Sequence, residues 1–106
     1  MDDQEKSIYI FHVDGTEEEL HGIMKEWLVE NQFERMEDGD RIYYQNRRRC
    51  ISYEIGKMQI TLYVYLKYRN RTVPLESGRV GMIDAMSYLN ILTPLFTELN
   101  ARSIEG

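Results

Sequence analysis

The sequence is short of the residues that build common covalent and metal sites. It has a single cysteine, Cys50, and two histidines. One cysteine excludes an intrachain disulfide and a zinc site built on several thiolates. The chain also has no glycine-rich phosphate loop, no histidine pair at metal-ligating spacing and no apolar run long enough to span a bilayer. We therefore expect no metal centre, no cofactor and no membrane-spanning segment.

The composition is that of one soluble globular domain. The chain has 106 residues, of which 42% are hydrophobic and 29% are charged. It starts Met-Asp-Asp-Gln-Glu-Lys, which lacks the basic and apolar segments of a signal peptide. We expect a single domain over residues 1–106 in the cytoplasm, with residues 1–6 and 102–106 frayed.

The clearest pattern lies in residues 50–68, where apolar and polar residues alternate on both sides of Gly56 and Lys57. This period of two is expected of strands that bury one face. A two-residue loop with glycine first suits a type II′ turn, which predicts that Ile55 lies opposite Met58. The face turned away from the core is then predicted to carry Tyr43, Gln45, Arg48, Cys50, Ser52, Glu54, Gln59, Thr61, Tyr63 and Tyr65.

The residues before this hairpin predict a strand and a helix. Residues 8–14 are apolar or aromatic on both parities, which favours a strand covered on both faces. Thr16 and Glu19 have the spacing of a capping box at a helix start. This helix is expected to end near Asn31 and to bury one apolar stripe, consisting of Leu20, Ile23, Met24, Trp27 and Leu28.

A second hairpin is predicted within residues 33–46, ahead of the central one. Asp38-Gly39 is a dipeptide typical of type I′ turns. A turn at that pair places Arg35 opposite Ile42. The sheet therefore gains two short strands on the N-terminal side of the central hairpin.

The C-terminal third predicts a loop and a second helix. Residues 69–81 contain proline and two glycines, as in an irregular loop. Helical spacing then resumes, and Pro94 should kink or restart the helix, with Thr93 as a possible new N-cap. Its predicted apolar stripe consists of Met82, Ile83, Met86, Leu89, Leu92, Phe96 and Leu99. The expected fold is α+β: an antiparallel β-sheet of about five strands, in the order β-α-β-β-β-β-α, with two helices packed on one face.

Charge is unevenly distributed along the chain. Residues 1–40 carry 13 acids and 3 bases, residues 41–80 carry 9 bases and 2 acids, and residues 81–106 carry 1 base and 3 acids. The predicted register gathers six cations at one end of the central hairpin: Arg47, Arg48, Arg49, Lys67, Arg69 and Arg71. Binding of nucleic acid or of a phosphorylated ligand is one interpretation. The alternative is that acidic residues of the first helix neutralise this cluster, and the net charge of −5 also disfavours non-specific nucleic-acid binding.

Three tyrosines, Tyr43, Tyr63 and Tyr65, stand among polar residues on the predicted outer face of the sheet. Tyrosine offers a large contact area with a polar tip and is enriched at protein interfaces. A homodimer interface is therefore the first interpretation of this face. A ligand groove is the second, and ordinary exposed sheet is the third.

The residues that could act as catalysts are few. Cys50 and His12 would form a nucleophile and base only if their strands were neighbours, and His21 is expected to be solvated. An enzyme with a pocket under residues 69–81 is thus the least favoured class. The sequence predicts a small non-enzymatic interaction domain that binds itself or another protein.

Overall fold

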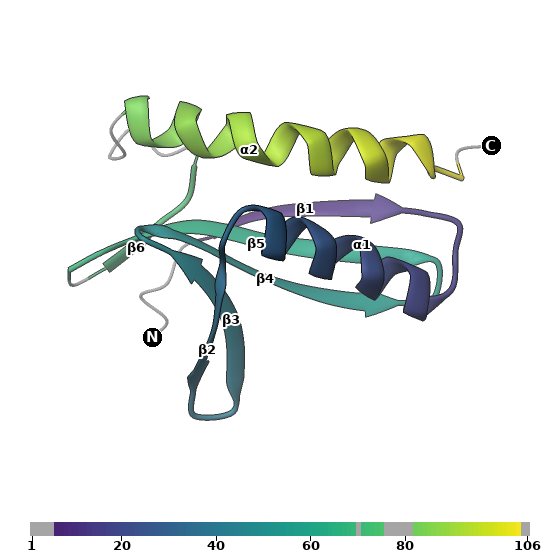
Figure 1. Cartoon of the computed structure of the whole chain (residues 1–106), viewed down its shortest axis with the longest axis horizontal. Coiled ribbons are helices and arrows are strands. Elements are labelled where there is room, and N and C mark those ends of the chain that lie inside the picture. The colour runs from purple at the N-terminus through teal and green to yellow at the C-terminus, as the bar shows by residue number, and fades with distance from the viewer. Residues whose placement is uncertain (1–5, 70, 76–81, 105–106) are drawn as a thin grey trace.

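The computed structural model describes residues 6–69, 71–75 and 82–104. Six strands form one antiparallel sheet in the order β1-β5-β4-β3-β2, with β6 also paired to β5, and two helices pack against it (Figure 1). The predicted α+β fold is confirmed, with one strand more than expected. The elements are β1 (Ser7–His12), α1 (Glu17–Glu30), β2 (Glu34–Asp38), β3 (Arg41–Asn46), β4 (Arg49–Gly56), β5 (Gln59–Tyr68), β6 (Arg71–Val73) and α2 (Met82–Ala101).

The additional strand, β6, begins inside the segment that the sequence predicted to be an irregular loop. Arg71 pairs with Tyr68 and Val73 with Leu66, so the chain folds back on β5 at once. Val73 is 1% exposed, and its burial explains why these residues extend the sheet. The rest of the predicted loop, residues 76–81, lies outside the described residues.

Strand β5 pairs with β1, β4 and β6 and supplies much of the core. Alternate residues on its helix-facing side are at most 1% exposed, as the period of two predicted. They pack with buried residues of both helices in a single apolar cluster. The β5 residues concerned are Ile60, Leu62, Val64 and Leu66.

Helix α1 begins and ends where the sequence predicted. The backbone N–H of Glu19 donates to Thr16 Oγ1 at 3.1 Å, and the backbone N–H of Thr16 donates to Glu19 Oε1 at 3.0 Å. Asn31 is the C-cap. The predicted stripe is buried along its whole length: Leu20, Ile23, Met24, Trp27 and Leu28.

Helix α2 runs through Pro94 as one assigned helix, so the predicted restart is wrong. The Thr93 hydroxyl donates to the carbonyl of Leu89 at 2.8 Å, which is a bond of the helix interior and not of an N-cap. The predicted stripe is also partly wrong, because Ile83 is 83% exposed and Met86 is 56% exposed. The face that packs on the sheet instead carries Tyr88, Leu92, Leu95 and Leu99.

Both hairpins turn one residue later than predicted. Ile55 pairs with Ile60 rather than with Met58, and Met58 sits at the tip with a φ of 57°. In the other hairpin Arg35 pairs with Tyr44 rather than with Ile42. Moving a tip by one residue moves the register by two, so the residues within the paired strands keep their predicted faces. Arg48 lies just before β4 and does not keep its predicted outer face, because it contacts Tyr68 on the side of α2.

Strand β1 forms an edge of the sheet, paired with β5 alone among the named strands. Tyr9 and Phe11 face the core and lie 4.9 and 5.6 Å, between ring centroids, from Phe96. Ile8 and Ile10 are 57% and 55% exposed, so the prediction that both faces are covered is wrong. An edge strand on a sheet with both helices on one side has only one face to bury.

The chain's last described residues are attached to the end of β1. The backbone N–H of Asp14 donates to the carbonyl of Arg102 at 2.9 Å, and that of Ile104 donates to the carbonyl of His12 at 3.2 Å. Residues 102–104, which the sequence predicted to fray, are thus hydrogen-bonded to the sheet. Residues 1–5 and 105–106 lie outside the described residues.

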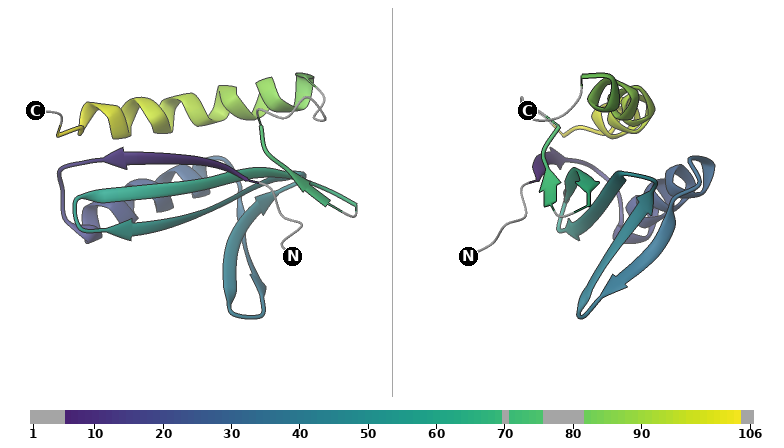
Figure 2. Two further views of the ribbon diagram at one scale, coloured as in Figure 1. Left: turned by 180° about the vertical axis from the view of Figure 1, so that it is seen from behind. Right: turned by 90° about the vertical axis from the view of Figure 1, so that its left-hand side faces the viewer.

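The β2–β3 hairpin bends away from the rest of the sheet, on the side opposite α2 (Figures 1 and 2). It therefore stands as a wall beside the outer face of β4 and β5. Within the described part of the chain, neither helix combines the length and apolar character needed to cross a membrane.

Candidate functional site

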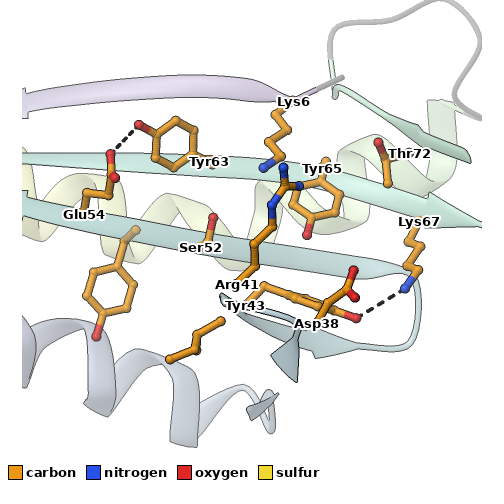
Figure 3. A pocket seen from close by; sticks show the side chains of 12 residues that line it. Lys6, Asp38, Arg41, Tyr43, Ser52, Glu54, Tyr63, Tyr65, Lys67 and Thr72 are labelled. Carbon is orange, nitrogen blue, oxygen red and sulfur yellow. Dashed lines mark hydrogen bonds between the residues drawn. The ribbon is translucent and has the colours of Figure 1, made fainter. Parts of the chain in front are cut away.

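A groove of about 450 Å³ lies on the outer face of the sheet, beside the β2–β3 hairpin (Figure 3). One wall comes from β3 and the floor comes from β4 and β5. Four tyrosines and three basic residues dominate its lining. They are Tyr43, Tyr53, Tyr63, Tyr65, Lys6, Arg41 and Lys67.

Tyr63 and Tyr65 are held as neutral hydrogen-bonding groups. The Tyr63 hydroxyl donates to Glu54 Oε1 at 2.6 Å, and this bond raises the pKa of Tyr63. Tyr65 is 6% exposed, and desolvation raises its pKa further above the ordinary value. At neutral pH the floor of the groove therefore presents phenols and no phenolate.

The basic residues point into the groove from separate elements. Lys6 Nζ lies 5.7 and 5.4 Å from the ring centroids of Tyr63 and Tyr65, within reach of cation–π attraction. Lys67 Nζ donates to the Tyr43 hydroxyl at 3.3 Å. Figure 3 shows the Arg41 side chain directed toward Tyr65, whose pKa its positive charge lowers against the larger effect of burial.

The groove has a positive balance among its described residues. Three cations are opposed by two carboxylates, Asp38 and Glu54. One of these, Glu54, already accepts a hydrogen bond from Tyr63. An anionic group is therefore better matched to this groove than a cation.

The structure divides the predicted site residues into two groups. Tyr43, Tyr63, Tyr65 and Lys67 come together in the groove, as described above. Three of the predicted arginines lie around a smaller cleft of about 140 Å³, which is lined by Arg47, Arg48, Arg49, Leu66 and Asp84. Arg69 and Arg71 line neither cavity.

The arginines at the smaller cleft turn toward α2. Arg49 Nη2 donates to Ser87 Oγ at 2.7 Å. The Arg48 guanidinium lies 5.1 Å from the ring centroid of Tyr68, whose hydroxyl donates to Asp84 Oδ2 at 2.9 Å. The predicted six-cation cluster is therefore split between the two sides of the sheet.

Acidic residues of α1 do not neutralise the arginines Arg47, Arg48 and Arg49 within the described chain. The ion pair that involves α1 joins Glu19 Oε2 to Arg102 Nη1 at 3.7 Å. The other described ion pair joins Arg35 to Glu37 on β2. The alternative explanation for the basic cluster is therefore not realised among the residues described in one subunit.

Sequence reasoning missed three charged residues of the groove, Lys6, Arg41 and Asp38. The position of Arg41 could have been predicted, because Arg41 lies on the same face of its strand as Tyr43 and pairs with Asp38 across the hairpin. Lys6 gave no such signal. Its place depends on β1 pairing with β5, which local patterns do not specify.

Cys50 and His12 do not form a catalytic pair. His12 pairs with Gln59 at one end of β5, and Cys50 pairs with Tyr65 toward the other end, with β5 between their strands. His21 is exposed, and its Nδ1 lies 3.2 Å from the Tyr53 hydroxyl. Over residues 6–69, 71–75 and 82–104, no three His, Cys, Asp or Glu side chains form a group that could hold a metal ion.

Cys50 should be inert in the native protein. It is 0% exposed, and desolvation raises the pKa of its thiol to about 11. Because the thiolate is the reactive form, we expect no reaction with Ellman's reagent at pH 8 and complete reaction after unfolding in guanidinium chloride. Rapid labelling of the native protein, with its circular dichroism unchanged, would contradict this burial.

The raised pKa of Cys50 also makes the free energy of unfolding depend on pH. Burial of the neutral thiol contributes fully to stability below pH 9. This contribution is lost as the pH rises toward about 11, because the thiol of the unfolded chain ionises at a lower pH than that of the folded protein.

The comparisons with known proteins identify no relative. No protein-family model, no curated protein and no solved structure matches the chain. The function must therefore be inferred from the geometry of the groove.

Proposed function

We propose that this protein is a small non-catalytic binding domain whose groove holds an anionic group, a phosphate or a carboxylate, of a ligand or partner. The observation that carries the proposal is the convergence of Lys6, Arg41 and Lys67 over three tyrosine rings. These residues come from the segment before β1, from β3 and from β5, so the site depends on the fold and not on one loop. We keep the cytoplasmic location expected from the sequence as part of this proposal.

A ligand suits this groove better than a second copy placed face to face. In a symmetric dimer the same patch meets itself. Two hollow surfaces would then leave space between them, and the basic side chains Lys6, Arg41 and Lys67 of one copy would face those of the other. A ligand anion instead accepts hydrogen bonds from ammonium, guanidinium and phenol groups together.

The proposal can be tested by NMR titration with inorganic pyrophosphate and with citrate. We expect amide shift changes confined to the groove, around Tyr43, Tyr63 and Tyr65. Lys67→Ala should weaken binding at least about tenfold, since a hydrogen bond to a charged group contributes about 1.5–3 kcal/mol.

Lys25→Ala is the matched control for this titration. Lys25 is an exposed lysine of α1 and lies outside the groove, so its removal changes the net charge equally. If both variants weaken binding to the same extent, the effect is one of overall charge and the groove is not the site. Saturation without shifts in the groove would also overturn the proposal.

Nucleic-acid or phosphorylated-ligand binding is the alternative raised by the sequence, and it stays a prediction. It would use the basic cluster of Arg47, Arg48, Arg49, Lys67, Arg69 and Arg71. Arg48 contacts Tyr68 of β5 and Arg49 contacts Ser87 of α2, so two of these side chains already have partners within the subunit. The arginine cluster therefore supports a binding function less well than the tyrosine-lined groove does.

A further inference from the structure

The outer edge of β1 carries backbone groups that are not paired with any other described part of the chain. The N–H of Val13 donates to the carbonyl of Met58 on the β5 side at 3.1 Å. The direction of the backbone N–H and C=O groups alternates along a strand. The odd-numbered residues of β1 therefore hydrogen-bond to β5, whereas the backbone groups of Ile8 and Ile10 point away from β5. The bond from Ile104 N–H to the outward carbonyl of His12 agrees with this direction.

This open edge is short and bounded at both ends. Beyond Ile10, the carbonyl of His12 is occupied by Ile104. Before Ile8, the Ser7 hydroxyl accepts a hydrogen bond from the backbone N–H of Leu75 at 2.8 Å. Within the described residues, the N–H and C=O groups of Ile8 and Ile10 are therefore left for a partner outside the subunit.

The side chains at this edge are apolar and exposed. Ile8 and Ile10 are 57% and 55% exposed on the outer face, where Ile8 neighbours Tyr63 across the β1–β5 pair. Soluble proteins usually protect an edge strand with charge, proline or a bulge. Residues 7–11 carry none of these charges or prolines.

We propose that a second copy of the chain pairs with this edge, with β1 antiparallel to β1 of the partner. Ile8 lies opposite the partner subunit's Ile10, and Ile10 opposite the partner subunit's Ile8, about a twofold axis at Tyr9. All four outward N–H groups and all four outward C=O groups of these isoleucines then find partners. Each exposed isoleucine also gains an apolar cross-strand neighbour.

The residues of β1 match a second copy of β1 best in this register, which is why we propose a second copy as the partner. Shifting the pairing by two residues in one direction sets Ile10 opposite the partner subunit's Lys6. In the other direction it sets Ile8 opposite the partner subunit's His12, whose carbonyl is already occupied. Only the register centred on Tyr9 pairs isoleucine with isoleucine at both positions.

The pairing has a functional consequence for the groove. A twofold axis perpendicular to the sheet keeps both outer faces on the same side, so the dimer presents two grooves in one direction. A partner with two anionic groups can then bind both, with a gain in avidity. The dimer does not require that the grooves bind anions, and groove binding does not require the dimer.

The test is sedimentation equilibrium over a wide range of protein concentration. The wild-type protein should change from the mass of one chain to that of two as concentration rises. Ile8→Lys places a charge in the interface, and Ile10→Pro removes an outward N–H that β5 does not use. Both variants should lose the dimer and remain at the mass of one chain.

Val29→Lys is the matched control, because Val29 is 71% exposed and lies on α1, outside β1 and its outer edge. It should dimerise like the wild type. A wild-type protein that stays monomeric at every concentration overturns the proposal, and so do Ile8→Lys and Ile10→Pro variants that dimerise normally.

Amide exchange gives a second measurement that does not depend on a variant. The Ile8 and Ile10 amides should exchange more slowly as concentration rises, while other exposed amides stay unchanged. Concentration-independent exchange at both residues, in a protein that sediments as a dimer, places the interface elsewhere and also overturns the proposal.

Discussion

Replacing Trp27 with alanine is expected to lower the free energy of unfolding by about 3–5 kcal/mol. Trp27 is 5% exposed, and its ring centroid lies 5.0 Å from that of Phe33. Its indole N–H also donates to the carbonyl of Ile91 on α2 at 2.8 Å. One side chain thus joins the two helices and the start of the β2–β3 hairpin, and its loss removes apolar burial and a hydrogen bond together.

This change should be measured by urea unfolding followed by circular dichroism, because Trp27 is the only tryptophan and fluorescence is lost with it. Trp27→Phe is the companion variant, since it retains an aromatic ring but not the N–H donor. It should cost less than the alanine variant. A loss below about 1 kcal/mol for Trp27→Ala, the range of an ordinary surface substitution, would show that the indole is not packed as described.

The second large effect distinguishes two leucines that lie three residues apart on α2. Leu92 is 0% exposed and Leu89 is 37% exposed. Leu92→Ala should lower the free energy of unfolding by about 2–5 kcal/mol, whereas Leu89→Ala should cost under about 1 kcal/mol. Chemical denaturation of both variants under the same conditions measures the difference.

The two leucine variants control for each other, because the deleted atoms and the change in helix propensity are the same. Equal losses would mean that α2 is rotated about its axis from the orientation in the structure. A larger loss at Leu89 would restore the stripe predicted from the sequence.

That stripe was wrong for a physical reason. Apolar residues occur on more than one side of α2, so helical spacing alone allows several stripes. Tyr88 was not part of the predicted stripe, yet it is 0% exposed and its hydroxyl donates to the carbonyl of Cys50 at 2.7 Å. A buried tyrosine that finds an acceptor fills a core position as well as leucine does.

The strands were predictable in their faces but not in their exact pairing. Alternation fixed which residues of β4 and β5 lie under the helices, and a register error of two leaves that unchanged. Turn chemistry was the weaker guide. Gly56 remains in the strand, paired with Gln59, while Met58 adopts the left-handed conformation at the tip.

The groove was half predictable. Tyr43, Tyr63 and Tyr65 share a face by parity, so their gathering followed from the strands. The hollow itself depends on the bend of the β2–β3 hairpin, and Lys6 depends on the long-range pairing of β1. Neither the bend nor the long-range pairing produces a periodic pattern in the sequence.

The position of β1 also determines the order in which the molecule can assemble. Ser7 pairs with Val64, so β1 has no strand to pair with until the residues up to β5 have been synthesised. Contacts between such distant residues slow folding, and an unpaired apolar segment exposes a nascent chain to aggregation. Strand β5 must therefore be available before β1 can dock, and the apolar residues of β1 stay unpaired during that delay.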